Sequence, residues 1–462
     1  MEKDFKKLVD NKKDEIISSL QELIRIPSIL NEEDTSSEAP FGKEIRKALD
    51  YMMNKAKCDG FSTLYDEGYA GEISYGKKNE GNKTIGILCH LDVVPVSGNW
   101  LYPPFDAVID GNKLYGRGSG DDKGPTIAAY YALKIIKDNN IKLKNQIKII
   151  FGTDEETGWR GISHYLSKYQ APDLGFVPDA DFPLIYAEKG RMAIDLSAND
   201  FDQNDILVSI KGGERYNVVL DEATAVLKKS LLDEAILYTK KNNLKMDYKN
   251  QDDLFVLTFY GKSSHAMAPE NGINAGTYLC DFLKDYSNNK MVKYVAKYHH
   301  LSFFLENLGL DYNDYEMGPI TCNIGIMDIS KDNTRVTLDL RYPVRYDIDK
   351  FNQVLNEILT KNDLYIAKST NKKPHYVDPN DDLVKLLYDS YVKYTSDTKN
   401  KPTTIGGGTY ASTLPKAVTF GMRMPYEEEL AHQCNEYINL DTLFTTILIY
   451  IDAIIKLGEI DA

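Results

Sequence analysis

Residues 84–92 read TIGILCHLD, a short apolar run that ends in a histidine and an aspartate. A run of this kind, bounded by polar residues, predicts a buried strand. Residues 147–151, IKIIF, form a second strand-like run, and the acidic triplet of residues 154–156 follows it closely. Because ligands bind at the carboxyl ends of strands in an open α/β sheet, the two strand ends predict a site at one edge of such a sheet.

Helical spacing of apolar residues predicts a helix within residues 4–26, which Pro27 ends, and another helix over residues 126–133. Residues 190–382 have a different texture, with strands and helices that alternate as in a separate α+β unit. The strands expected there are Met192–Ser197, Leu254–Tyr260 and Arg335–Leu340, and the helices are Asp221–Lys240, Asn274–Asp285 and Lys350–Leu359.

After Asp382 the pattern returns to a helix over residues 383–394, and a glycine run and a histidine follow. The chain has 462 residues, too many for one compact core. We therefore expect two domains. Residues 1–189 and 383–462 form an α/β domain, and residues 190–382 are an α+β domain inserted into it.

The composition excludes several classes of protein. The net charge of −14 disfavours nucleic acid and anionic membrane as partners. No window approaches the roughly 18 apolar residues of a membrane span, and the first residues have no secretory signal pattern. The five cysteines are scattered without a CxxC pair, which is typical of reduced thiols. We therefore expect a cytoplasmic protein.

A metal site is the chemistry that the polar residues favour. His90 and Asp92 are two residues apart on a strand and face the same way, so the aspartate can hold the ring nitrogen that does not bind a metal. Alone, this pair is more often a solvated strand end. Residues 116–124, GRGSGDDKG, add a carboxylate in a glycine turn, and a cation would relieve the repulsion among the acids of residues 154–156.

These segments, together with Asp179 and His432, resemble the aminoacylase, carnosinase and carboxypeptidase group of co-catalytic zinc peptidases over nearly the whole chain. Within that group the chain is most similar to the PepV-type bacterial dipeptidases, a type described as Xaa-His dipeptidases or carnosinase-like enzymes. The stretches that carry this similarity are residues 116–125, 178–183, 406–411 and 432–436. The resemblance implies a catalytic α/β/α domain with a mixed sheet, interrupted by a lid domain that binds substrate.

The resemblance also implies two divalent metal ions. Their ligands are His90 and Asp179 for one ion, Glu156 and His432 for the other, and Asp121 for both, with a cis peptide bond after Asp121. Asp92 orients His90, and Glu155 is the general base that activates a metal-bridging water. Zinc suits this ligand set best, and manganese or cobalt would also be accepted.

Residues of the expected lid domain are the candidates for substrate binding. His265, in GKSSHA, is the expected donor to the oxyanion, and Asn217 matches a second lid residue of the same branch. Arg341 is the candidate for the terminal carboxylate of a small peptide, since a guanidinium matches a carboxylate in a bidentate way. Gly407 and Gly408 add backbone N–H donors. A surface histidine and a surface ion pair are the plainer interpretations of His265 and Arg341.

Two other functions compete with a dipeptidase. One is an N-acyl amino acid deacylase of the acetylornithine deacetylase or succinyl-diaminopimelate desuccinylase type. The other is an inactive ligand-binding relative, which would not need Glu155. The long insertion and the motif of residues 406–411 favour a dipeptidase, and the enlarged lid favours a monomer. A further hypothesis is that oxidation of Cys89 or Cys434, which neighbour metal ligands, perturbs metal binding.

Overall fold

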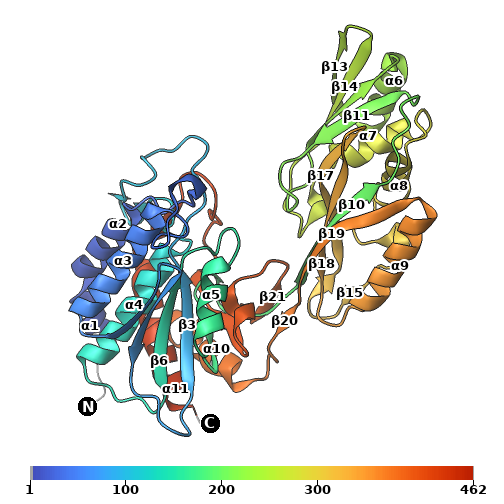
Figure 1. Cartoon of the computed structure of the whole chain (residues 1–462). Coiled ribbons are helices and arrows are strands. Elements are labelled where there is room, and N and C mark those ends of the chain that lie inside the picture. The colour runs from blue at the N-terminus through green and yellow to red at the C-terminus, as the bar shows by residue number, and fades with distance from the viewer. Residues whose placement is uncertain (1–3, 461–462) are drawn as a thin grey trace. The chain divides into compact units, whose positions relative to one another are not determined.

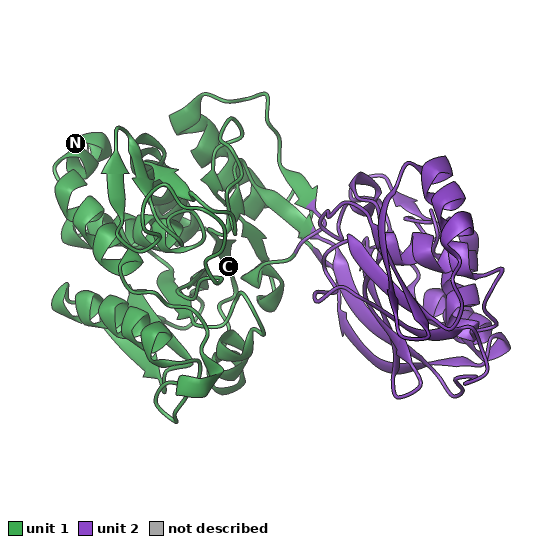
Figure 2. Ribbon diagram, turned by 90° about the horizontal axis from the view of Figure 1, so that it is seen from above, with its two compact units in different colours: residues 1–187, 376–404, 408–462 green, residues 188–375, 405–407 purple. Residues whose placement is uncertain are grey.

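The computed structural model describes residues 4–460 and divides into two compact units. Unit 1 contains the residues up to Ala187, Tyr376–Thr404 and the residues from Gly408 onward. Unit 2 contains Glu188–His375 and Ile405–Gly407 (Figure 2). The predicted fold class is confirmed, since an α/β unit is interrupted by an inserted α+β unit.

Unit 1 is built on a mixed sheet whose strands run in the order β1-β2-β6-β3-β7-β22-β9-β20, with β21 paired to β9. Strand β3 (Thr84–His90) is parallel to both of its neighbours, β6 (Gln146–Gly152) and β7 (Leu174–Val177). All seven residues of β3 are buried, which explains why its sequence reads as a continuous apolar run. The other strands are β1 (Ser62–Asp66), β2 (Ala70–Tyr75), β22 (Ala417–Thr419), β9 (Ile185–Glu188), β20 (His375–Tyr376) and β21 (Thr403–Ile405).

Helices pack on the sheet of unit 1 (Figure 1). Helix α4 (Lys123–Asp138) contacts β3, and α11 (Leu440–Glu459) contacts both α4 and β6. Leu88 and Ile150 belong instead to a core cluster with residues of α5 (Arg160–Lys168). The remaining helices of this unit are α1 (Phe5–Asp10), α2 (Lys13–Ile24), α3 (Lys43–Cys58) and α10 (Asp382–Thr395).

Unit 2 has an antiparallel sheet in the order β13-β14-β12-β11-β17-β18-β10-β19. Its strands are β10 (Gly190–Ala198), β11 (Leu207–Gly212), β12 (Glu222–Leu227), β13 (Lys245–Gln251), β14 (Leu254–Tyr260), β17 (Thr321–Ser330), β18 (Thr334–Tyr342) and β19 (Leu364–Lys372). Its helices are α6 (Leu232–Asn242), α7 (Ala275–Leu283), α8 (Lys290–Tyr298) and α9 (Ile348–Lys361). Among residues 4–460, no helix is long and apolar enough to cross a membrane.

One predicted helix of unit 2 is wrong in its first part. The expected helix over Asp221–Lys240 is a strand over Glu222–Leu227 and a helix only from Leu232. Ala223, Ala225 and Leu227 are buried while the residues between them are more exposed, which is the period of a strand. Pairing with β11 and β14 on both sides outweighs the helical propensity of this alanine-containing stretch.

Candidate metal and catalytic site

The candidate metal ligands and the candidate base of unit 1 meet at the carboxyl ends of adjacent parallel strands. They are His90 at the end of β3, Glu155 and Glu156 after β6, Asp179 after β7, Asp121 before α4, and His432 between β23 (Met422–Arg423) and β24 (Tyr437–Asn439). Atoms of His90, Asp121 and Glu156 that can bind a metal lie within 4.8 Å of one another, and so do those of His90, Glu155 and Asp179. The edge of the sheet therefore gathers six side chains from five separate places in the sequence.

The carboxylate of Asp121 lies between two imidazoles. Its Oδ1 is 2.9 Å from Nε2 of His90, and its Oδ2 is 3.1 Å from Nε2 of His432. Nε2 of His432 is also 3.0 Å from Oε2 of Glu156, and Nε2 of His90 is 3.8 Å from Oδ1 of Asp179. Each imidazole is thus grouped with one carboxylate of its own and with Asp121, the arrangement that two neighbouring metal ions with a shared ligand require.

Asp92 fixes the orientation of His90. Nδ1 of His90 is 2.9 Å from the backbone oxygen of Asp92 and 3.5 Å from its Oδ1. This contact makes Nδ1 the donor and leaves Nε2 as the atom that faces Asp121. The Asp92 carboxylate also accepts the backbone N–H groups of Glu155 and Glu156, at 3.1 and 3.0 Å. Asp92 therefore positions the imidazole mainly through its backbone oxygen and the two glutamates through its carboxylate.

The loop that carries Asp121 is held against β3. The peptide bond between Asp121 and Asp122 is cis, as the resemblance implied. Oδ2 of Asp122 accepts the backbone N–H of His90 at 2.9 Å and the hydroxyl of Thr126 at 3.3 Å. Asp122 therefore joins the start of α4 to the end of β3, away from the atoms that would contact a metal.

The acidic groups of the site are buried close together. Burial raises the pKa of Glu155 well above its ordinary value, and the charge of Asp179 raises it further. Burial and the charge of Asp121 raise the pKa of Glu156 to about 7 and that of Asp179 to about 6. Burial lowers the pKa of His432, but its hydrogen bonds to Asp121 and Glu156 outweigh this and raise the pKa to about 11.

This donor set fits a pair of divalent cations. Closely spaced buried carboxylates repel one another, and a cation among them favours their charged forms. Two imidazoles with several carboxylate oxygens suit zinc, manganese and cobalt. The residues present therefore have the chemistry that two such ions need.

Tyr410 belongs to the site, although the sequence singled it out only as part of the motif of residues 406–411. Its side chain is buried, and its ring lies edge-on to the rings of His90 and Trp159. A Cβ atom on Gly152 would lie 2.6 Å from its hydroxyl oxygen, which explains the glycine at the end of β6. Among the described residues, this hydroxyl has no hydrogen-bond partner. No pattern in the sequence signals a buried ring contact of this kind.

The candidate substrate-binding residues of unit 2 lie close to one another. The backbone oxygen of Asn217 accepts the N–H of Ala266 at 3.0 Å, which places Asn217 beside the exposed His265. The hydroxyl of Thr321 donates to the backbone oxygen of Ala266 at 3.4 Å, and Thr321 is the register partner of Arg341. Unit 2 therefore brings Asn217, His265 and Arg341 together at one end of its sheet.

Arg341 is buried and already paired. Its Nε and Nη2 donate to the two carboxylate oxygens of Asp339 at 2.7 and 2.8 Å. Its Nη1 makes only a long contact, 3.4 Å, to the backbone oxygen of Gly406. Asp339 thus fixes the guanidinium in one orientation and leaves Nη1 as the donor for a further anion. Of the two candidate glycines, Gly407 belongs to unit 2 and Gly408 to unit 1.

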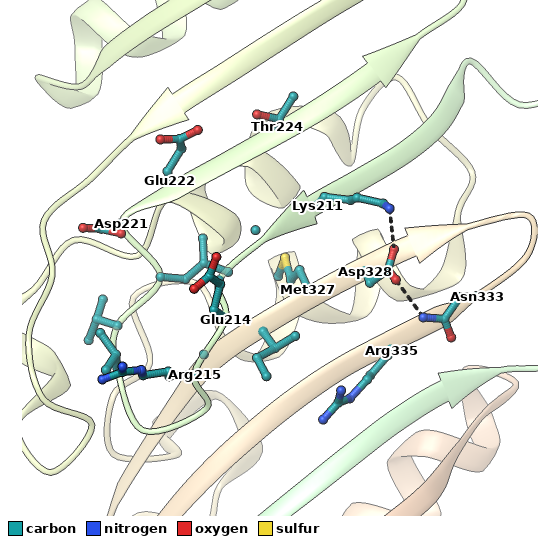
Figure 3. Close-up of a pocket in the computed structure, with 17 residues that line it drawn as sticks. Lys211, Glu214, Arg215, Asp221, Glu222, Thr224, Met327, Asp328, Asn333 and Arg335 are labelled. Carbon is teal, nitrogen blue, oxygen red and sulfur yellow. Dashed lines mark hydrogen bonds and ion pairs between the residues drawn. The ribbon is translucent and has the colours of Figure 1, made fainter. Parts of the chain in front are cut away.

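A cavity of about 890 Å³ lies elsewhere in unit 2, over β11, β12 and β17 (Figure 3). None of the candidate residues lines it. Lys211 and Asp328 face each other across neighbouring strands, with 4.0 Å between their charged atoms, and Asn333 donates to Asp328 at 2.8 Å. The candidate metal-binding and catalytic residues therefore lie in the clusters described above and not in this cavity.

Comparison with known proteins identifies relatives over nearly the whole length of the chain. The model of Peptidase family M20/M25/M40 matches residues 86–456. A Staphylococcus aureus (strain bovine RF122 / ET3-1) protein named "Putative dipeptidase" is 40% identical over 469 residues, which cover 98% of this chain and 99% of that protein. A protein with the same description from strain USA300 has the same identity and coverage.

Solved structures share the fold at low sequence identity. Human carnosine dipeptidase 1 superposes with a TM-score of 0.57 at 14% identity and covers 98% of both chains. A dipeptidase of Saccharomyces cerevisiae gives 0.58 at 14% identity, again over 98% of both chains. A metallo-carboxypeptidase of Sulfolobus solfataricus gives 0.57 at 18% identity and covers 96% of this chain and 99% of its own.

The unpaired hydroxyl of Tyr410 leads to a stability prediction for the metal-free protein. Tyr410→Phe removes a buried polar group that has no partner, so the free energy of unfolding stays the same or rises by up to about 1 kcal/mol. Tyr450→Phe is the matched control, since the buried hydroxyl of Tyr450 donates to the backbone oxygen of Phe420 at 2.8 Å. That substitution leaves a carbonyl unpaired and costs about 1–3 kcal/mol. Urea unfolding measures both values, and an equal loss in the two variants would mean that Tyr410 has a partner.

Proposed function

Because this chain belongs to Peptidase family M20/M25/M40, we propose that it is a dipeptidase that works with two divalent metal ions, zinc being the most suitable. The observation that carries the proposal is the Asp121 carboxylate, whose two oxygens lie 2.9 and 3.1 Å from the imidazoles of His90 and His432. His90 and Asp179 would hold one ion, Glu156 and His432 the other, and Asp121 both.

When bound, two such ions lower the pKa of water and polarise a peptide carbonyl. Glu155 takes the proton of the attacking water and delivers it to the leaving amine. The backbone N–H of Glu155 donates to the carboxylate of Asp92, and this hydrogen bond holds the base in position. His265 donates to the oxyanion as the carbonyl carbon becomes tetrahedral, which is worth about 3–4 kcal/mol in comparable sites.

Arg341 would recognise the terminal carboxylate of the dipeptide through Nη1, the atom that Asp339 leaves available. Gly407 and Gly408 would add backbone donors to the same carboxylate, and Asn217, beside His265, would contact the substrate as well. Recognition of the free carboxylate at a fixed place selects the C-terminal peptide bond for cleavage. A site that also closes around the other end of the substrate would exclude longer peptides, which is the physical reason for a dipeptidase.

The first test is metal dependence. Protein stripped with a chelator is expected to lose activity toward dipeptides and to regain it on addition of zinc, manganese or cobalt, with two ions per chain at full activity. Elemental analysis and activity are measured on the same samples. Full activity in protein that contains no divalent metal would refute the proposal.

Variants of two adjacent glutamates distinguish the role of general base from the role of metal ligand. Glu155→Gln is expected to lower kcat by about 10²–10⁴-fold, because it removes proton transfer, while the metal content stays at the wild-type level. Glu156→Gln, the matched variant, is expected to lower the metal content as well. Elemental analysis beside steady-state kinetics distinguishes them, and a Glu155→Gln enzyme with wild-type kcat would exclude Glu155 as the base.

Substrate class is tested with a panel of Xaa–Xaa dipeptides, their C-terminal amides and N-acyl amino acids. We expect hydrolysis of the free dipeptides and little turnover of the amides, because Nη1 of Arg341 would lose its anionic partner. Arg341→Lys is expected to raise KM for dipeptides about 10-fold or more, since hydrogen bonds to charged groups are worth about 1.5–3 kcal/mol. N-acyl turnover without dipeptide hydrolysis would favour the deacylase alternative.

A further inference from the structure

Glu436 is buried, and its carboxylate accepts hydrogen bonds from the loop that carries Asp121. Its Oε2 accepts Nη1 of Arg117 at 2.7 Å and the backbone N–H of Gly118 at 3.1 Å. Its Oε1 accepts the backbone N–H groups of Gly120 at 2.8 Å and of Asp121 at 3.2 Å. Both carboxylate oxygens are thus used, and one of the donors is the N–H of the residue proposed to contact both ions.

The same glutamate is close in sequence to the other metal-binding segment. It follows His432 by four residues, and its own backbone oxygen accepts the N–H of Gly116 at 2.9 Å. The chain between His432 and Glu436 is therefore anchored to the glycine turn at one end, while Nε2 of His432 meets the Asp121 carboxylate at the other, 3.1 Å away. A shift of either segment would move the other.

A carboxylate is the side chain that this place requires. The loop presents three backbone N–H donors to Glu436 and one cationic side chain, Arg117, and both residues are about 1% exposed. Ionised acceptors make the stronger hydrogen bonds in such buried settings. An amide in place of the carboxylate would direct N–H groups at N–H donors on one side and leave Arg117 without a counter-ion.

We propose that Glu436 is a positioning residue that couples the two metal sites by fixing the Asp121 loop to the segment of His432. The inference rests on the proposed two-metal function. Outer residues that hold metal ligands in place commonly account for 10–100-fold in metal affinity. Because Asp121 is shared, the loss of Glu436 would weaken both ions and not one of them.

Zinc titration of the metal-free protein by calorimetry tests this proposal. Glu436→Asp keeps the charge beside Arg117 but shortens the side chain, so it cannot reach all of the backbone donors, and Glu436→Gln keeps the length but loses acceptors. Both variants are expected to bind the two zinc ions about 10–100-fold more weakly than wild type. Circular dichroism and the urea midpoint of the metal-free proteins verify that each variant is folded.

Glu427 supplies a matched control from the same stretch of chain. Its carboxylate accepts the backbone N–H of Met424 and the side-chain donors of Asn439 and Thr442, at 2.6–2.9 Å, and these three partners lie outside the Asp121 loop. Glu427→Gln therefore tests whether any loss of a carboxylate in this segment weakens metal binding. Zinc affinities at the wild-type level are expected for this control.

The outcomes separate this inference from the function it rests on. Wild-type protein that binds fewer than two zinc ions would refute the two-metal function whatever the variants do. Wild-type binding of two ions, with unchanged affinities in folded Glu436→Asp or Glu436→Gln, would overturn the role of Glu436. An equal loss in Glu427→Gln would overturn it too, since the effect would then not depend on contact with the Asp121 loop.

Discussion

The mutual repulsion of buried carboxylates at the edge of the unit 1 sheet is the constraint on which the rest of the site depends. Burial raises the pKa of Glu155, Glu156 and Asp179, and neighbouring acids raise each of them further. A fold does not retain such a cluster for stability, because burying acids together costs free energy. The cluster is consistent with side chains selected to surround cations, and the imidazoles of His90 and His432 complete that environment.

The fold supplies this cluster by topology. Strands β6, β3 and β7 are parallel neighbours, so the residues that follow them arrive at the same edge of the sheet. Loops from other parts of the chain then add Asp121 and His432. Those loops adjoin β5 (Lys113–Tyr115) and β24 (Tyr437–Asn439), which pair with each other outside the main sheet. Buried polar contacts add to that pairing: Asp122 joins the Asp121 loop to β3, and Glu436 joins it to the segment of His432. The positions of the candidate metal ligands therefore depend on the hydrogen bonds of Asp122 and Glu436 as well as on the sheet.

Much of this arrangement could be predicted from the sequence, for a physical reason. A buried parallel strand reads as an apolar run, and polar residues directly after it are placed by the strand itself, as His90 and Glu155 illustrate. Residues whose position depends on distant contacts gave no such signal. Asp339, which fixes Arg341, and Tyr410, whose ring packs on Gly152, depend on pairings that only the folded chain reveals. The strand Glu222–Leu227 was predicted as a helix because its neighbours in the sheet, and not its own residues, decide its conformation.

The two units divide the chemistry between them. The acids and imidazoles of unit 1 suit the cleavage of any amide bond that lies beside two cations. Their arrangement does not by itself select peptides of a particular length. Unit 2 carries the groups suited to recognition: a guanidinium fixed by Asp339, an exposed histidine and the backbone of the glycine run. Since Asp339 pairs with Nε and Nη2 of Arg341, Nη1 is the nitrogen left to meet a further anion. Recognition at this nitrogen would require a free carboxylate in the substrate, so the preference for a free C-terminus would follow from the pairing of Arg341 and Asp339 and not from the metal ligands.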